Sequence, residues 1–233
     1  MIRTLAQAAR WIDEVGAALL FPKADVTMPS LWDQVHGGPT SIRDADGKFV
    51  AWADGMSFLW GAKDDLSGQG LACVGKHLAR MATCVTPRLL PALVAANGEP
   101  GDDPVADAIR DLGPLTTRQV RDVTGLTKKE VDRAIVQLHR KLVLTNSHLV
   151  EQDGSWGTLA HDLVARKWKL PKKLPSREQG RRELAETILR NAGELTAADL
   201  RGVVGWRPTE CAAVLDEIAE SRDEDGFRIW VRP

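Results

Sequence analysis

Two stretches of the sequence decide its fold: AIRDLGPLTTRQVRDVTGLTKKEVDRAIVQL at residues 108–138 and ILRNAGELTAADLRGVVGWRPTECAAVLDEI at residues 188–218. They align without a gap. The aligned pairs include Gly113 with Gly193, Leu115 with Leu195, Thr116 with Thr196, and Gly125 with Gly205. Because each copy of an internal repeat marks one supersecondary unit, the chain is predicted to contain the same small helix-turn-helix domain twice.

Capping and turn residues around the two copies extend this prediction to tandem winged helices. For the first copy they predict helices over 104–112, 118–124 and 128–141, strands over 142–145 and 149–151, and a helix over 159–168. For the second copy they predict helices after Ser176, after Thr196 and from Pro208, and a closing strand over 226–231. Three helices followed by a hairpin is the order of a winged helix.

The first hundred residues have weaker patterns. Periodicity and turn residues predict a helix over 5–20, a hairpin turning at Asp54-Gly55 within 49–59, and helices over 71–81 and from Pro87 to Ala96. The resulting fold class is mainly α with small β-hairpins (α+β), built from tandem winged-helix (helix-turn-helix) domains. The predicted division is 1–98, a mostly helical, winged-helix-like domain; 104–168, a winged helix; 169–175, a basic linker; and 176–233, a C-terminal winged helix.

Composition limits where the protein works. The 233 residues carry a net charge of −1, and no apolar run approaches the roughly 20 residues of a membrane helix. The N-terminus lacks the pattern of a secretory signal, and the cysteines are scattered and number three. We therefore expect a cytoplasmic protein with no membrane partner.

The near-neutral total charge conceals a basic middle section. Residues 104–150 have 8 Lys/Arg against 5 Asp/Glu, and residues 151–190 have 9 against 6. In a helix-turn-helix the third helix lies in the major groove of DNA, and its outward residues here are Lys128, Lys129, Arg133, Gln137 and Arg140. Such residues bind phosphates or base edges, so this helix is predicted to contact double-stranded DNA. A merely solvated charged face is the alternative.

Neighbouring residues extend the predicted DNA contact. Arg118 and Arg121 on the preceding helix, and Lys172 and Lys173 in the linker, would hold phosphates. Trp156, between two glycines in the predicted wing, would touch a sugar or base.

The second copy replaces the basic face with an acidic one. Arg133 corresponds to Ala213, Gln137 to Glu217, and Arg140 to Glu220. Phosphates would repel this helix, so we expect the second copy to brace the first or to bind a protein partner.

The sequence contains no established catalytic or cofactor motif. Its five histidines lack metal-ligand spacing and no glycine-rich phosphate loop occurs, so we expect no metal and no cofactor. The cluster Lys63-Asp64-Asp65 is either catalytic or a turn or helix start. The tryptophans at 11, 32, 52 and 60 form either a buried core or a surface that stacks on a flipped base.

Several segments together resemble a known family. His161-Asp162-Leu163-Val164-Ala165-Arg166, a proline-containing linker, Arg182-Glu183-Leu184 and the run Gly193 to Leu200 are similar to the AlkZ/YcaQ-like winged-helix superfamily, in particular its short AlkZ-related branch. The resemblance implies a bacterial DNA repair protein, because members are DNA glycosylases that release alkylated or crosslinked bases. Members use a pair of polar residues, Gln-x-Gln or Gln-x-Asp, and those positions fall near Leu19 and Phe21 here.

Both residues at these positions are apolar, so neither can position water or stabilise a cationic sugar. We therefore predict a DNA-binding protein that is not an enzyme and has no catalytic residues. An active glycosylase that uses a displaced carboxylate, such as Asp13, Glu14 or Asp25, is the first alternative. A protein–protein interaction scaffold is the second.

Overall fold

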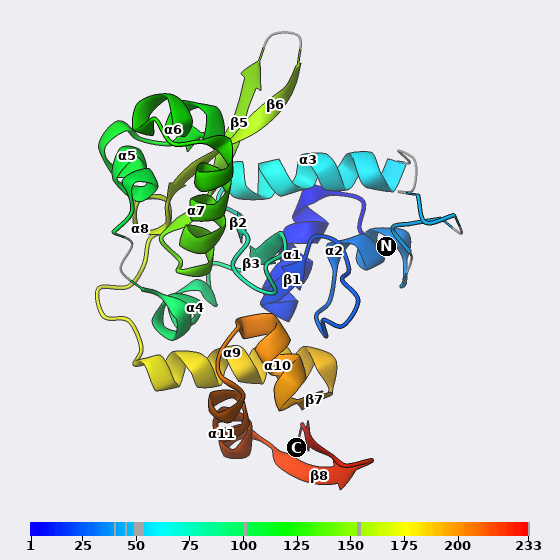
Figure 1. Ribbon diagram of the computed structural model, residues 1–233. Helices are drawn as coiled ribbons and strands as arrows, with labels where there is room; N and C mark the ends of the chain where they lie inside the picture. The colour runs from blue at the N-terminus through cyan, green and yellow to red at the C-terminus, as the bar shows by residue number, and fades with distance from the viewer. Residues whose placement is uncertain (40, 45, 49–53, 100–101, 153–154, 233) are drawn as a thin grey trace.

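The structure of the protein, a computed structural model, describes residues 1–39, 41–44, 46–48, 54–99, 102–152 and 155–232, and only the backbone of residues 54, 151, 152, 155 and 156 (Figure 1). Its N-terminal unit contains α1 (Leu5–Val15), β1 (Ala17–Leu19), α2 (Leu31–His36), α3 (Asp54–Gly68), β2 (Cys73–Gly75) and β3 (Thr83–Val85). The helix α4 (Leu90–Asn97) follows it.

Two further units complete the chain. The middle unit contains α5 (Pro104–Leu112), β4 (Leu115–Thr116), α6 (Thr117–Thr124), α7 (Lys128–Arg140), β5 (Leu144–Gln152) and β6 (Ser155–Leu163), and is followed by the short helix α8 (Val164–Lys167). The C-terminal unit contains α9 (Arg177–Ala192), β7 (Glu194–Thr196), α10 (Ala197–Val204), α11 (Pro208–Ile218), β8 (Glu220–Glu224) and β9 (Phe227–Val231).

The described elements of the three units follow one order: helix, strand, two helices, two strands. Their antiparallel sheets also share one strand order, β1-β3-β2, β4-β6-β5 and β7-β9-β8. In each unit the short first strand pairs with the last strand, as in Leu19 with Thr83, Leu115 with His161, and Leu195 with Trp230. Helices with small antiparallel sheets confirm the predicted α+β class.

The sequence repeat reproduces the same local structure in the middle and C-terminal units. Thr116 and Thr196 each cap the second helix of their unit with a side-chain oxygen. Gly125 and Gly205 end these helices in the left-handed conformation, with φ of 71° and 79°, which glycine adopts without steric cost. The threonines and glycines that align in the sequence are therefore the residues that begin and end the second helix of each unit.

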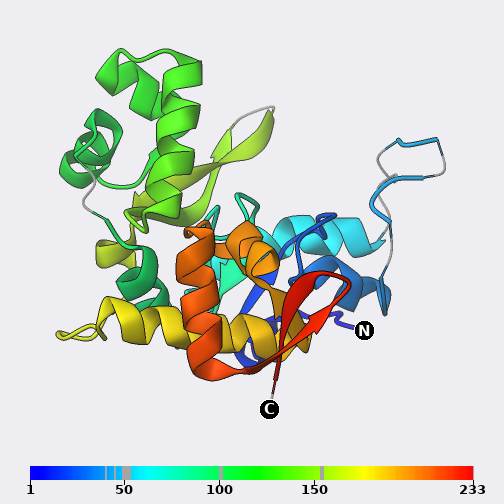
Figure 2. The same cartoon turned by 60° about the horizontal axis from the view of Figure 1, so that its bottom comes forward.

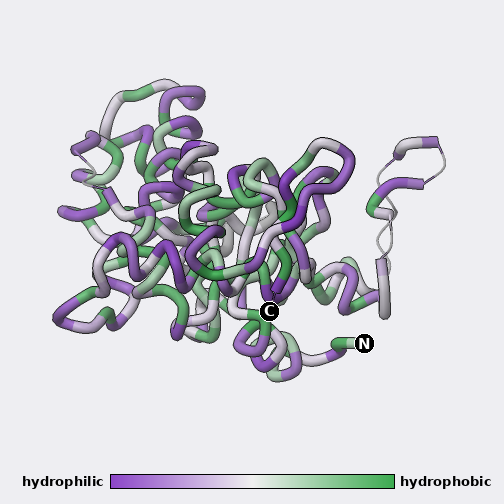
Figure 3. Tube along the Cα trace, turned by 90° about the horizontal axis from the view of Figure 1, so that it is seen from below, coloured by the Kyte–Doolittle hydropathy of each residue, from purple (hydrophilic) through white to green (hydrophobic). Residues whose placement is uncertain are grey.

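The amphipathic helices bury their apolar faces in three hydrophobic clusters. Hydrophilic and hydrophobic residues alternate along the helical turns (Figure 3). One cluster lies within the N-terminal unit and a second within the middle unit. The third joins all parts of the chain, because it includes Val85 of β3, Leu93 of α4, Val164 of α8 and Leu184 of α9.

The C-terminal unit is attached mainly through α9, which packs on α4 (Figure 2). Gly180 allows this close approach, because a Cβ there would lie 2.5 Å from the carbonyl oxygen of Ala92. Three hydrogen bonds support the attachment: Asn191 Nδ2 donates to the Val15 carbonyl, Trp206 Nε1 to Asn97 Oδ1, and the Ala79 amide to the Val203 carbonyl.

Several sequence predictions of local structure are wrong. The first helix ends at Gly16, where φ is 81°, and a strand follows it. Asp54 begins a 15-residue helix and is no hairpin turn, and residues 49–53 lie outside the described chain. Residues 71–81 contain a strand and a loop. Residues 155–163 are a strand, which leaves only 164–167 helical in the segment predicted as the helix 159–168.

The described helices include none that is both long enough and apolar enough to cross a membrane.

Candidate nucleic-acid interface

Helix α7 has the two faces that the sequence predicts. Thr127 caps its start by accepting a hydrogen bond from the Glu130 amide. Val131, Ile135 and Leu138 are buried in the core of the middle unit. The residues exposed to solvent are Lys128, Lys129, Arg133 and Gln137, together with the capping residue Glu130. The buried side chains fix the rotation of the helix, so the four predicted residues extend away from the protein.

The exposed face of α7 retains positive charge after internal pairing. Lys128 pairs with Asp132 one turn along the helix. Lys129 and Arg133 form no ion pair with any carboxylate in the described chain. An exposed ion pair such as Lys128–Asp132 is weak, so Lys128 can exchange its partner. Lys129 and Arg133 need break no ion pair to bind an anionic partner.

The other predicted contacts are also at the surface. Arg118 and Arg121 of α6, and Lys172 and Lys173 of the linker, are exposed. Trp156 lies in β6, but its side chain falls outside the description, as does the Asp153-Gly154 turn.

Arg140, at the C-terminal end of α7, lies in a different environment from the rest of the predicted set. It lines a cleft of about 370 Å³ between α7, the loop after β2 and α10. Three more cations line this cleft, Lys23, Arg80 and Arg201, and its lining includes no carboxylate. Nor does any ion pair within 4 Å join these four to a carboxylate in the described residues.

Sequence reasoning missed three of the four cations in this cleft. Lys23 and Arg80 lie in two loops of the N-terminal unit and Arg201 lies on α10 of the C-terminal unit, so only packing between units brings them near Arg140. No local pattern marks them. A search of the sequence for Lys and Arg residues with no Asp or Glu three or four positions away would have retained them as candidates.

A more enclosed cavity of about 580 Å³ lies behind α7, between the N-terminal and middle units. Its polar lining includes Lys63 of α3, Lys76, Asp132 of α7 and His161 of β6. Phe21 and Trp60 supply aromatic surface. The cavity therefore combines apolar walls with a few polar groups, which is typical of ligand sites.

Three buried histidines link the two units, and two of them, His139 and His161, line this cavity. His77 Nδ1 donates to the carbonyl of His139 (2.8 Å), and His139 Nδ1 accepts from the Lys76 amide (3.1 Å). This fixes the proton of His139 on Nε2, which donates to His161 Nδ1 at 3.2 Å. Burial lowers the pKa of His77 and His161 to about 4, and lowers that of His139 well below its ordinary value. All three rings are therefore neutral at pH 7.

A third cavity, of about 1070 Å³, is lined by residues of α3 and of the β5–β6 hairpin. These two elements are neighbours in the fold (Figure 1). Trp60, Lys63 and Asp64 line it from α3, and Leu149 and Leu159 line it from the hairpin. Lys63 Nζ lies 2.6 Å from Asp64 Oδ1 and 4.7 Å from the centre of the Trp60 ring. The expectation of a turn or helix start here is wrong, because both charged residues lie in the interior of α3.

The tryptophans of the N-terminal unit have separate roles. Trp32 is 1% exposed in the core, and Trp11 packs against the same cluster. Trp60 is 40% exposed, and Trp52 lies outside the described residues. Among those described, the buried-core interpretation holds for Trp11 and Trp32 and does not hold for Trp60.

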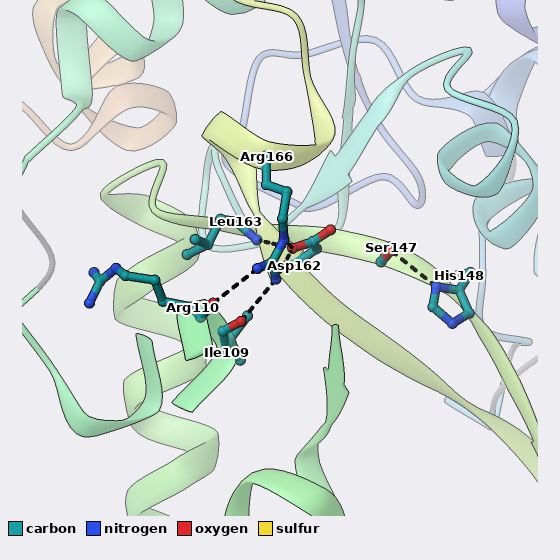
Figure 4. A network of polar contacts seen from close by, with 7 residues as sticks. All are labelled: Ile109, Arg110, Ser147, His148, Asp162, Leu163 and Arg166. Atoms are coloured by element: carbon teal, nitrogen blue, oxygen red, sulfur yellow. Dashed lines mark hydrogen bonds and ion pairs between the residues drawn. The ribbon is translucent and has the colours of Figure 1, made fainter. Parts of the chain in front are cut away.

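The segment 161–166, which carried the family resemblance, forms a group of hydrogen bonds around Arg166 that we call the clasp (Figure 4). Arg166 Nε donates to Asp162 Oδ1 at 2.6 Å, and its other nitrogens donate to the carbonyls of Ile109 and Arg110 at the end of α5. The guanidinium thus donates to two carbonyls of the last turn of α5, of which that of Ile109 also accepts from the Gly113 amide. These hydrogen bonds hold β6 and α8 against the end of α5.

Helix α11 has the same buried pattern as α7 and a different surface. Cys211 and Leu215 are buried, at positions equivalent to Val131 and Ile135. The exposed Glu217 pairs with Arg182 of α9 at 2.6 Å. Its acidic face is therefore partly neutralised within its own unit.

Comparison with known proteins identifies the family. A family model described as "DNA glycosylase AlkZ-like" matches residues 91–233. The chain belongs to this family. It is similar to the solved structure of "Streptomyces sahachiroi DNA glycosylase AlkZ" at 11% sequence identity and a TM-score of 0.48, covering 100% of this chain and 70% of that chain. No curated protein matches the sequence.

Leu19 and Phe21, the positions that the sequence resemblance assigns to the polar pair, have different surroundings. Leu19 is fully buried in β1, whereas Phe21 lines the 580 Å³ cavity. The alternative carboxylates Asp13, Glu14 and Asp25 are exposed, and none of them lines that cavity. Among the described residues, no group of three or more His, Cys, Asp and Glu side chains could hold a metal ion.

Proposed function

We propose that each of the three units is a winged helix and that the protein binds double-stranded DNA through the middle one. The proposal rests on the shared order of elements and strands. In a winged helix the third helix is the reading helix, which here is α7. Lys129, Arg133 and Gln137 of α7 then face the groove, and Arg118 and Arg121 of α6 bind the flanking backbone.

The observation that carries the proposal is the set of cations that no carboxylate neutralises. Lys129 and Arg133 on α7, and Arg140 with its three neighbours in the cleft, form no ion pair in the described chain. Each phosphate contact releases counterions, so the affinity should fall steeply with salt, with a slope of about −0.9 per phosphate. The net charge of −1 is compatible with this, because residues 104–190 of the chain are basic whereas the total is near neutral.

We further propose that this member binds DNA without cleaving a glycosidic bond. Apolar residues occupy the positions that the sequence resemblance assigns to the family's polar pair, and Leu19 has no contact with solvent. An active DNA glycosylase is the second candidate function, and membership of a family of glycosylases favours it. We assign no protein partner to α11, because Arg182 already pairs with Glu217.

Binding of a labelled 20-base-pair duplex at several salt concentrations tests the proposal. We expect Lys129→Ala/Arg133→Ala to weaken binding about 10-fold to 100-fold and to reduce the salt slope by about 2. The matched control, Arg222→Ala/Arg232→Ala, removes the same charge from the C-terminal unit and should change affinity less than about twofold. Absence of binding by the unmodified protein at low salt would refute the proposal.

A parallel incubation with alkylated duplex distinguishes the two candidates. Alkaline cleavage at new abasic sites would establish the glycosylase, whereas binding without cleavage supports the non-catalytic protein. The Asp64→Asn variant belongs in the same assay, because Asp64 is a carboxylate that lines a cavity beside the proposed DNA surface.

A further inference from the structure

We propose that the cavity between α3 and the β5–β6 hairpin binds a single unpaired nucleobase of DNA. Trp60 would stack on the base, and the Lys63–Asp64 pair would bind its hydrogen-bonding edge. This inference rests on the proposed DNA binding and adds to it the form of DNA that the protein selects.

The cavity has the size and lining that a flat heteroaromatic ring requires. Its volume is about 1070 Å³, and most of its lining is apolar, from Trp60, Gly61, Leu149 and Leu159. Ligand sites are mostly apolar with a few placed polar groups. Here those groups gather on the α3 wall, at Lys63 and Asp64.

Two large hydrophobic side chains at this cavity remain exposed. Trp60 is 40% exposed on α3, and Leu149 is 41% exposed on the opposing strand β5. An exposed apolar surface with polar groups at its edge is typical of a binding site. Gly157 supports the arrangement, because a Cβ there would lie 2.8 Å from the Leu149 side chain.

The ion pair on the α3 wall favours a nucleobase over a purely apolar ligand. The Lys63 and Asp64 side chains are only 13% and 11% exposed, although both carry charge. Their mutual contact uses Asp64 Oδ1 and one ammonium hydrogen, and the described residues form no other hydrogen bond to either group. Asp64 Oδ2 can therefore accept and Lys63 can donate, which complements the mixed donors and acceptors of a base edge.

The cavity is continuous with the proposed DNA surface. Trp60, Lys63 and Leu159 also line the 580 Å³ cavity behind α7. That cavity includes Asp132, which pairs with Lys128 on the exposed face of α7. A duplex held by α7 would thus lie beside the entrance, and β5 of the hairpin packs next to α7 (Figure 1).

The test compares two labelled duplexes of the same sequence, one fully paired and one with a single unpaired adenine. An unpaired base needs less energy to leave the stack, so the unmodified protein should bind the bulged duplex about 10-fold more tightly. Trp60→Ala should reduce this preference to less than about twofold and leave the affinity for the paired duplex unchanged. Trp60→Phe keeps a ring and should retain most of the preference. Phe227→Ala, which removes another exposed aromatic, is the matched control.

A second variant tests the polar wall. Asp64→Asn should weaken binding of unpaired adenine and cytosine, whose amino groups donate, about 10-fold relative to unpaired thymine. The decisive quantity is the ratio of the affinities for the two duplexes, because a folding defect lowers both affinities together.

Equal affinity of the unmodified protein for the two duplexes would overturn the inference, as would full preference in Trp60→Ala. In both cases the proposed DNA binding would stand. Failure to bind either duplex at low salt would overturn both proposals.

Discussion

Helices α7 and α11 occupy equivalent positions in two copies of one unit, yet their surfaces carry opposite charge. Their inward residues are interchangeable in kind, with Val131 and Ile135 in one and Cys211 and Leu215 in the other. The outward residues change from Arg133 and Gln137 to Ala213 and Glu217. Buried side chains thus preserve the unit, while exposed ones are free to diverge.

The two units also differ in how they attach to the N-terminal unit. Buried imidazoles join the middle unit to it, through His77, His139 and His161. The C-terminal unit instead joins through close packing of α9 on α4 at Gly180. One attachment is polar and titratable, whereas the other is mainly apolar.

Exchanging the surfaces of the two helices gives the largest expected effect. Lys129→Glu/Arg133→Glu/Gln137→Glu makes α7 acidic and should weaken duplex binding about 1000-fold or more, since phosphates repel it. The reciprocal change Ala213→Arg/Glu217→Gln should alter affinity less than about twofold, because α11 is not the reading helix. Fluorescence anisotropy at constant salt measures both. Equal losses in the two variants would contradict the division of roles.

Acid should affect the polar attachment more than the apolar one. Burial holds the pKa of His77 and His161 at about 4, below the unfolded value near 6.5. The unfolded chain therefore takes up protons first, and stability falls as the pH drops from about 6.5 towards 4. We expect a loss of about 3 kcal/mol between pH 7 and 5, measured by urea unfolding.

Two histidine variants check that acid response. His161→Gln should make the pH dependence shallower, because one of the titrating rings is gone. The exposed His148 provides the control, and His148→Gln should leave the slope unchanged. A slope that is the same in all three proteins would exclude the buried imidazoles as its source.

The clasp of the middle unit should have an intermediate effect. Arg166→Ala removes hydrogen bonds to Asp162 and to the end of α5, and leaves Asp162 unpaired at 6% exposure. We expect a loss of about 2 kcal/mol in the free energy of unfolding. Arg166→Lys keeps the charge without the planar fork and should lose about half as much. Chemical denaturation distinguishes the variants, and equal stability of Arg166→Ala and the unmodified protein would refute the role.

The contact between α4 and α9 gives the smallest expected effect. Gly180→Ala places a methyl group 2.5 Å from the Ala92 carbonyl, so the helices must separate, at a cost of about 1 to 2 kcal/mol. Gly202→Ala is the matched control in α10, where the nearest atom lies 3.9 Å away. That variant should be neutral or stabilising, because alanine favours helix. A stabilised Gly180→Ala would contradict the close packing.

Much of the repeat could be predicted from the sequence, because its signals are local. Threonine caps, left-handed glycines and the helical spacing of apolar residues locate α5, α6 and α7 within one residue of the predicted bounds. The predicted first residues of α10 and α11 are also correct. The predictions failed where tertiary pairing overrides local preference, as in β6, whose apolar residues also suit a helix.

The candidate site was less predictable, since its residues are distant in the chain. Arg140 was found on a helix face, whereas Lys23, Arg80 and Arg201 meet it only through packing between units. The ion pair at Lys63 and Asp64 was noticed as a charged cluster and misplaced at a turn. Its significance depends on the hairpin opposite, about 90 residues further along the chain.

The hydrophobic cluster that joins all parts of the chain has a consequence for biosynthesis. Leu90 and Leu93 of α4 emerge from the ribosome long before Leu184 and Ile188 of α9, which cover them. The apolar face of α4 therefore stays open to water until the last fifth of the chain is made. We expect the nascent protein to need a chaperone at that stage, and a chain that stops before α9 to be degraded.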